Sequence, residues 1–183
     1  MRHVDSPRKF LILKRFLVSL GLVVLTGFLI PERFVVPVEG AAPSDWNAAS
    51  FWFEPWGASG THKGIDIFAP IGRTVRSSTA GIVLLSGNVN TGGNIVVVLG
   101  PKWRLHYYAH LDSTSVGGGN LVAPGDMIGT AGDTGNARGK QPHLHYVILS
   151  MIPYPWHFDT GTQGWKRMFY LDPTPKLLAA SGS

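Results

Sequence analysis

Six histidines lie downstream of residue 60, and imidazole is the side chain best suited to bind metals and move protons near neutral pH. The chain of 183 residues contains no cysteine, so thiolate ligands and disulfides are excluded. A metal site in this chain therefore has to use imidazole and carboxylate groups. The candidate histidines are His62, His106, His110, His143, His145 and His157.

The first candidate pair is the sequence His143-Leu144-His145. The residues that follow it are Tyr, Val, Ile and Leu, which favour a β-strand. Residues i and i+2 of a strand point to the same face, so both imidazoles can enter one pocket while Leu144 faces the other way. The alternative interpretation is that both are surface or core histidines without a chemical role.

The second candidate pair is His62 and Asp66. Gly64 and the sequence Ile-Asp-Ile-Phe that follows it predict a turn that runs into a strand, with Asp66 opposite its isoleucine neighbours. A buried carboxylate in such an apolar segment is costly unless a cation or a hydrogen-bond donor compensates it. A solvent-facing aspartate on an edge strand is the alternative.

The third candidate segment is 105–111. Strict alternation along this strand predicts that His106, Tyr108 and His110 lie on one face, from which the last histidine can reach a pocket. A half-exposed histidine without a role is again the alternative.

Together these segments offer two imidazoles and one carboxylate, with further imidazoles to spare. Three protein ligands leave one position open for water or substrate, which is typical of catalytic Zn²⁺ sites. Zinc lowers the pKa of a water towards neutrality, and a neutral histidine nearby can accept its proton. The same ligand set is also typical of non-haem iron oxygenases, which the residue types alone do not exclude.

The elements that must position these residues begin after an apolar N-terminus. Residues 16–30 carry no charge and follow Lys14 and Arg15, which is typical of an export signal or a signal anchor. The basic segment 1–15 is expected in the cytoplasm and everything after residue 30 outside. Fifteen helical residues span only about 22 Å of a hydrocarbon core of roughly 30 Å, so a cleaved signal peptide and an uncleaved anchor both stay open.

Beyond a linker at 31–46, the chain predicts an all-β domain over 47–150. Short β-branched runs separated by Gly-rich turns favour an antiparallel sheet arranged as a sandwich or barrel. The segment 151–183 is rich in proline and aromatic residues and is predicted to be an irregular C-terminal extension. The predicted strands are 65–68, 82–85, 95–99, 105–111, 120–122, 127–128 and 143–149.

The charge distribution argues against nucleic acid as a partner. The formal net charge is +5, of which residues 1–40 contribute +3, so that the remaining 143 residues carry only +2. No basic run interleaved with aromatic residues occurs in the predicted β-domain.

Residues 60–149 resemble the LytM/lysostaphin-type zinc peptidases, which cleave peptidoglycan cross-links. The resemblance implies that His62, Asp66 and His145 hold Zn²⁺, while His110 and His143 orient and deprotonate the water and stabilise the tetrahedral intermediate. His106 and His157 match no functional position and are expected to be structural. The motifs that carry the resemblance are Gly60-Thr61-His62-Lys63-Gly64-Ile65-Asp66-Ile67, Ala69-Pro70-Ile71-Gly72, Tyr108-Ala109-His110-Leu111, Val122-Ala123-Pro124-Gly125-Asp126, Gly132-Asp133-Thr134-Gly135 and His143-Leu144-His145.

Two features depart from the family pattern. Tyr146-Val147 stands where many relatives have Phe-Glu, and no tyrosine occurs between Ala41 and His62, where some relatives place one to assist the oxyanion. The anchor-like N-terminus and the absence of cysteine favour a cell-envelope protein, anchored in the inner membrane or secreted, with its catalytic domain in the periplasm. The alternative function is a non-catalytic envelope protein that binds wall or activates another hydrolase.

Overall fold

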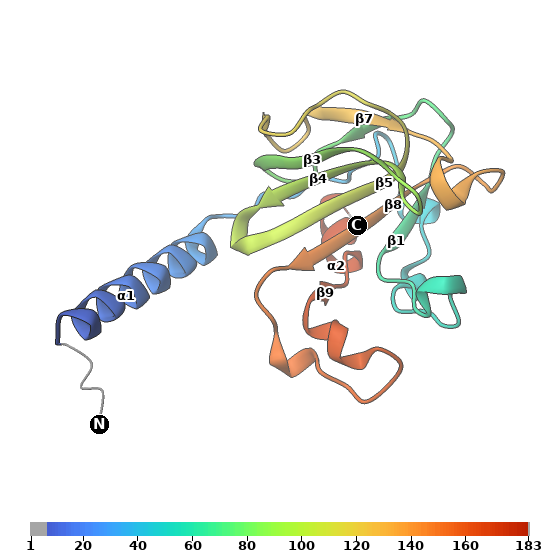
Figure 1. Ribbon diagram of the computed structural model, residues 1–183. Coiled ribbons are helices and arrows are strands. Elements are labelled where there is room, and N and C mark those ends of the chain that lie inside the picture. The colour runs from blue at the N-terminus through green and yellow to red at the C-terminus, as the bar shows by residue number, and fades with distance from the viewer. Residues whose placement is uncertain (1–6, 183) are drawn as a thin grey trace.

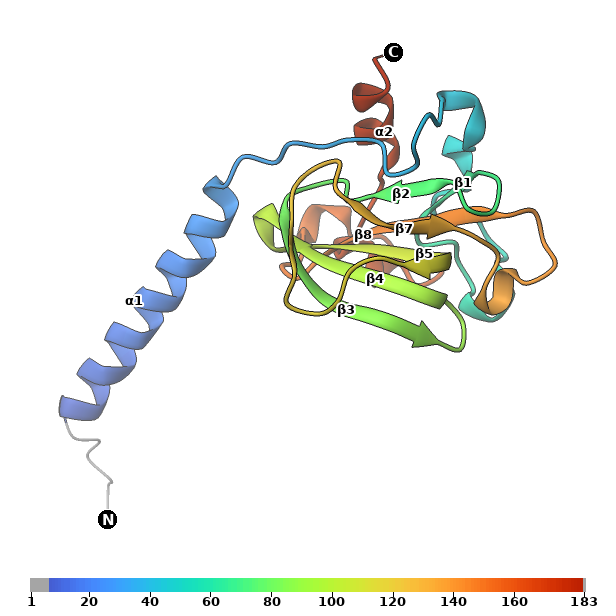
Figure 2. The same ribbon diagram turned by 90° about the horizontal axis from the view of Figure 1, so that it is seen from above.

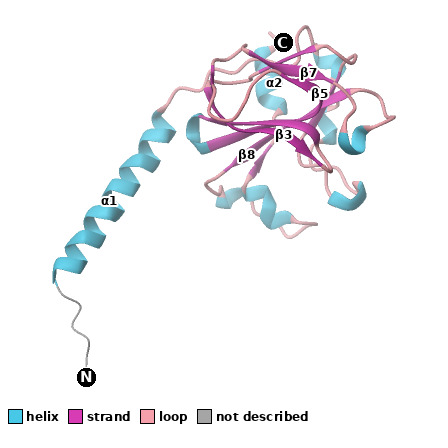
Figure 3. Cartoon of the chain, turned by 45° about the horizontal axis from the view of Figure 1, so that its top comes forward, coloured by secondary structure: helices cyan, strands magenta, loops and turns pink. Residues whose placement is uncertain are grey.

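A long N-terminal helix projects from a β-domain in the computed structural model, which describes residues 7–182 (Figure 1). The helix α1 covers Pro7–Leu29, and the first six residues of the predicted basic segment lie outside the described residues. The helix begins well before residue 16, where the predicted apolar segment starts. Lysine and arginine are good helix formers and extend the helix into the basic segment. Every other helical segment is short and lies around the strands (Figure 3).

The surface of α1 is apolar and largely uncovered. Phe10, Phe16 and Leu22 are each about 60% exposed or more, and only 6% of the apolar window in this helix is buried. Its 23 residues span about 34 Å, comparable with the roughly 30 Å of a bilayer core. The helix is long and apolar enough to cross a membrane, as a signal sequence also is.

The predicted antiparallel fold is confirmed. Nine strands form one sheet with the order β1-β8-β5-β4-β3-β6, and β7 pairs with both β2 and β5. Strands β2 and β9, of three and two residues, were not predicted. The strands are β1 Ile65–Phe68, β2 Thr74–Arg76, β3 Gly81–Val89, β4 Gly93–Gly100, β5 Arg104–Thr114, β6 Leu121–Val122, β7 Met127–Ala131, β8 His143–Ser150 and β9 Tyr170–Leu171.

Strand β5 is the longest and connects the two parts of the sheet. Its first half pairs with β4 and β8, and its end pairs with β7; Figure 2 shows β2 and β7 lying over β8, β5, β4 and β3. Alternate residues of these strands face inward and build one core. That core includes Ile65, Ile67, Val75, Val96, Val98, Tyr108, Leu111, Ile128, Leu144, Tyr146 and Ile148.

The predicted linker 31–46 packs against the β-domain. Val38 is buried and bridges Val75 of β2, and the side chain of Glu32 forms ion pairs with Arg104 and Lys176. The reason is the apolar run Phe-Val-Val-Pro-Val at 34–38, whose burial outweighs the turn-forming tendency of its prolines. The segment that leaves α1 is therefore fixed to the β-domain.

The expected irregular extension 151–183 is corrected in its last part. Strand β9 pairs with β8, and helix α2, Thr174–Ala180, follows it. Leu177 of this helix is fully buried within the main core. The C-terminal residues thus complete the core, while most of residues 151–169 are exposed or half-exposed and include two short helical turns.

Truncation of Leu177 tests whether α2 belongs to the core. We expect Leu177→Ala to lower the free energy of unfolding by about 2–5 kcal/mol, because it leaves a cavity among packed side chains. The neighbouring Leu178 is 38% exposed, and Leu178→Ala should cost less than about 1 kcal/mol. Denaturant unfolding measures both variants. If Leu177→Ala lowered the free energy of unfolding as little as Leu178→Ala does, α2 would be a surface element.

Candidate metal and catalytic site

The side chains of His62, Asp66 and His145 converge at the junction of β1 and β8. Asp66 and His145 are directly paired across these two strands, and His62 reaches them from the preceding turn. The Oδ1 atom of Asp66 lies 3.0 Å from Nε2 of His62 and 2.7 Å from Nδ1 of His145. The two nitrogen atoms are 3.1 Å apart, so three potential ligand atoms meet at one point.

The hydrogen bonding of His62 makes this meeting point suitable for a cation. Its Nδ1 lies 2.9 Å from the carbonyl oxygen of Ser50, and because a carbonyl can only accept, Nδ1 must donate. The Nε2 lone pair of the neutral ring then faces the Asp66 carboxylate, and two acceptors in contact repel unless a cation or proton lies between them. Zinc bonds of about 2.0–2.1 Å in tetrahedral geometry place ligand atoms about 3.3 Å apart, close to the separations of this trio.

The protonation states of Asp66 and His145 are those of metal ligands. Burial raises the pKa of the Asp66 carboxyl, but the contacts with His145 and His62 outweigh burial and hold the pKa well below its usual range. Burial lowers the pKa of His145, against the opposing effect of Asp66. A charged carboxylate and a neutral imidazole are therefore present near neutral pH.

His110 and His143 adjoin the trio. Their rings are 5.0 Å apart in an edge-to-face arrangement, and Nε2 of His143 lies 3.9 Å from the Asp66 carboxylate. The Nδ1 atoms donate to the carbonyl oxygens of Thr134 and Gln141, respectively. Each ring is therefore fixed in the tautomer that leaves Nε2 without a proton, as a general base requires.

The charge state of His110 supports a role in proton transfer. Burial, followed by the neighbouring His143 and His145, lowers its pKa to about 4. The ring is therefore neutral at pH 7 and able to accept a proton there.

The predicted common face of His106, Tyr108 and His110 is wrong for the last residue. A β-bulge interrupts the pairing of β4 and β5 between Asn94 and Val96, and His110 itself has a φ of 62°. The extra residue reverses the alternation at that point, so His110 lies beside His143 rather than in the core. A bulge leaves no trace in a hydrophobic pattern, which is why the sequence did not predict it.

Glycine at position 93 allows the approach that orients His110. Gly93 has a φ of 64°, and a Cβ atom there would lie 2.2 Å from the hydroxyl oxygen of Thr134. The turn 91–93 therefore packs directly against the residue whose carbonyl fixes the His110 ring.

His106 and His157 lie away from the trio. His106 is fully buried, with Nδ1 2.6 Å from the Tyr146 hydroxyl on the core side of the sheet. His157 is exposed and stacks on Tyr154 in the C-terminal segment. Both positions agree with the structural roles expected for them.

His106 should make stability fall in acid. Burial, reinforced by the charges of Arg104 and Lys176, lowers its pKa from 6.5 to about 3. Between these values the unfolded chain takes up a proton that the folded chain does not, so the free energy of unfolding decreases as pH falls from 6.5 towards 3, by up to about 1.4 kcal/mol per pH unit.

Urea unfolding of the full chain in detergent at several pH values measures this slope. We expect His106→Gln to flatten it between pH 6.5 and pH 4, while the exposed His157→Gln leaves it unchanged. Parallel slopes for all three proteins would contradict the assignment.

Sequence reasoning missed two contributions to the site. Trp56 packs against His62 with ring centroids 4.2 Å apart and the rings tilted by 34°. Its only signal in the sequence was the cluster of aromatic residues before the histidine. The carbonyls of Ser50, Thr134 and Gln141 orient three of the rings. Backbone groups leave no sequence signal, because every residue carries one.

An antiparallel β-domain that brings together an imidazole–carboxylate–imidazole trio and two further imidazoles has the architecture of a metal-dependent hydrolase. Residues 60–153 match Peptidase family M23, and the chain therefore belongs to this family. M23 peptidases are zinc metallopeptidases, and the trio provides a suitable zinc-binding group.

Individual relatives agree with this assignment. The chain is 38% identical over 88 residues to the peptidoglycan DD-endopeptidase ShyA of Vibrio cholerae, which covers 48% of this chain and 20% of that protein. Its fold is similar to the catalytic domain of lysostaphin from Staphylococcus simulans, with a TM-score of 0.55, 28% identity, and coverage of 68% of this chain and 85% of that one. It is also similar to a zinc-containing peptidase from Vibrio cholerae, with a TM-score of 0.53 and 32% identity over 63% of this chain and 36% of that one. The chain spans only about a fifth to a third of the length of the curated relatives such as ShyA.

Proposed function

We propose that this protein is a zinc endopeptidase that hydrolyses peptide cross-links of bacterial peptidoglycan. His62, Asp66 and His145 hold the metal, and His110 and His143 perform the proton transfers. The observation that carries the proposal is the convergence of the trio within about 3 Å beside two imidazoles whose tautomers are fixed. Membership of the M23 family and the resemblance to a peptidoglycan DD-endopeptidase support the choice of substrate.

The hydrogen bonds of His110 and His143 support the proton-transfer roles proposed for them. Zinc, when bound, supplies a Lewis acid and lowers the pKa of the attacking water. The unprotonated Nε2 atoms of His110 and His143 are placed to take the proton from that water, since their Nδ1 protons are held by carbonyls. The imidazolium that results can stabilise the oxyanion of the tetrahedral intermediate and then protonate the leaving amine.

The apolar helix α1 supports a location in the cell envelope. We propose that its basic end remains in the cytoplasm and its apolar part crosses the membrane, with the β-domain in the periplasm. Because residues 32–38 are fixed to the β-domain, the peptidase would be held close to the membrane surface.

Product analysis tests this function. We expect the zinc-loaded full chain in detergent to convert a defined cross-linked muropeptide dimer into monomers with a new amino terminus, detected by mass spectrometry. His157→Ala should retain this activity, because the exposed His157 has no contact with the site. Binding of the dimer without turnover in the presence of zinc would instead support a non-catalytic wall-binding protein.

A further inference from the structure

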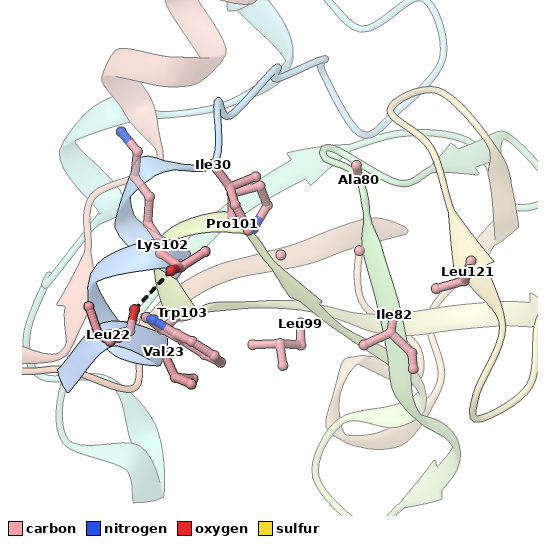
Figure 4. A pocket seen from close by; sticks show the side chains of 14 residues that line it. Leu22, Val23, Ile30, Ala80, Ile82, Leu99, Pro101, Lys102, Trp103 and Leu121 are labelled. Atoms are coloured by element: carbon pink, nitrogen blue, oxygen red, sulfur yellow. Dashed lines mark hydrogen bonds between the residues drawn. The ribbon is translucent and has the colours of Figure 1, made fainter. Parts of the chain in front are cut away.

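An apolar pocket of about 580 Å³ lies between the end of α1 and the edge of the sheet, and no residue of the metal and catalytic site lines it. Figure 4 shows its walls: Leu22 and Val23 from α1, Ile30 directly after it, Ala80 and Ile82 around the start of β3, Leu99 from β4, and Leu121 from β6. The volume falls within the roughly 300–1,000 Å³ that is typical of ligand sites. Leu121 is 80% exposed, so the pocket is open to its surroundings on this side.

The contact between α1 and the β-domain is specific. The indole nitrogen of Trp103 donates to the carbonyl oxygen of Val24 at 2.9 Å. A Cβ atom on Gly27 would lie 2.1 Å from the same indole nitrogen, so the tryptophan can lie against α1 only because this position is glycine.

The turn that presents Trp103 has an unfavourable backbone. Lys102 and Trp103 have φ values of 60° and 57°, a region that residues other than glycine rarely adopt. Such conformations persist where a function or the surrounding packing requires them. Here the turn places Trp103 against the helix, while the Lys102 ammonium extends away from the apolar lining (Figure 4).

The position of this contact along α1 determines what surrounds the pocket. Val24 lies six residues before the end of the uncharged run 16–30, which is about 9 Å along a helix. The whole run measures only about 22 Å, so all of it is needed within a hydrocarbon core of roughly 30 Å. If α1 spans the membrane, the contact between Trp103 and Val24 therefore lies about 9 Å inside the outer boundary of the hydrocarbon core, so the pocket faces acyl chains, and the Lys102 side chain can extend towards the interfacial layer.

We propose that this pocket binds the acyl chain of a phospholipid from the outer leaflet, with Lys102 beside the phosphate, and that the β-domain is thereby seated in the membrane surface. The inference rests on the proposed membrane anchoring by α1. It adds a lipid-binding site on the peptidase domain itself, formed by the turn 101–103, the start of β3 and Leu121.

Site-specific fluorescence quenching tests the proposal on the full chain in phosphatidylcholine vesicles. The absence of native cysteine allows single labels at Leu121→Cys, at Val18→Cys in the middle of α1, and at Ile71→Cys, an exposed turn position outside the pocket. We expect a spin-labelled lipid with its nitroxide near the headgroup to quench a bimane at position 121 at least about threefold more than one at position 71. The label at position 18 should be quenched by a nitroxide deep in the acyl chain.

The three labels separate the possible failures. If the spin-labelled lipid quenches the label at position 18 but not the label at position 121, the lipid site is overturned. This holds whether the pocket is then open to water or covered by a partner helix. A label at position 18 that no lipid quenches would show instead that α1 is not a membrane anchor. Neither result would bear on the peptidase activity, which the muropeptide assay measures separately.

Discussion

Replacing Asp66 by asparagine is expected to weaken zinc binding by more than about 100-fold and to abolish turnover. Substitution of a residue that only hydrogen-bonds to a metal ligand already costs about 10–100-fold in metal affinity. Asp66→Asn should cost more, because it removes the only carboxylate of the trio itself. The amide keeps the size of the side chain but carries no negative charge to balance the cation. Competition with a fluorescent chelator measures the affinity, and the muropeptide assay measures the turnover.

A matched substitution at an exposed position provides the control. Asp112 lies on β5 with its side chain at the surface, so Asp112→Asn should leave both zinc affinity and turnover unchanged. An Asp66→Asn protein that binds zinc as tightly as the wild type would show that the carboxylate is not a ligand. Its pairing with His62 and His145 would then be structural.

His143→Ala is expected to separate metal binding from catalysis. The imidazole of His143 adjoins the trio without taking part in its closest contacts, so one zinc per chain should be retained. Turnover should fall by about 10²–10⁴-fold, the usual contribution of a general acid or base. Elemental analysis of the purified variant and its initial rate on the muropeptide dimer give the two quantities.

Each alternative outcome for this variant assigns a different role to His143. Loss of zinc together with activity would make it a ligand, and full activity would make it a bystander. His157→Ala serves as the control, because His157 is an exposed histidine in the C-terminal segment.

Much of the fold followed from local patterns. The sequence Ile-Asp-Ile-Phe predicted β1 with its bounds unchanged, and the alternation around Leu144 predicted which side chains of β8 face the core. The docking of residues 31–46 and the packing of Leu177 were not predicted. Both depend on contacts between segments more than thirty residues apart, which a local pattern does not encode.

The sequence predicted which residues could form a site, and the structure brings them together in a geometry that the sequence did not predict. Spacing along strands placed Asp66 and His145 on usable faces, and only the ordered resemblance to zinc peptidases combined them with His62. The position of His110 depends on a bulge, and the orientation of its ring depends on the carbonyl of Thr134. Neither the bulge nor a backbone carbonyl has a signature in the types of residue present.

X-ray absorption at the zinc edge of the full chain tests the central claim most directly. The structure predicts two imidazole nitrogens and two oxygen ligands, one from Asp66 and one from solvent, at about 2.0–2.1 Å. The Asp66→Asn protein should lose this spectrum. A first shell with three or more imidazoles, or a protein that retains iron in place of zinc, would contradict the assignment of His62, Asp66 and His145 as the zinc ligands.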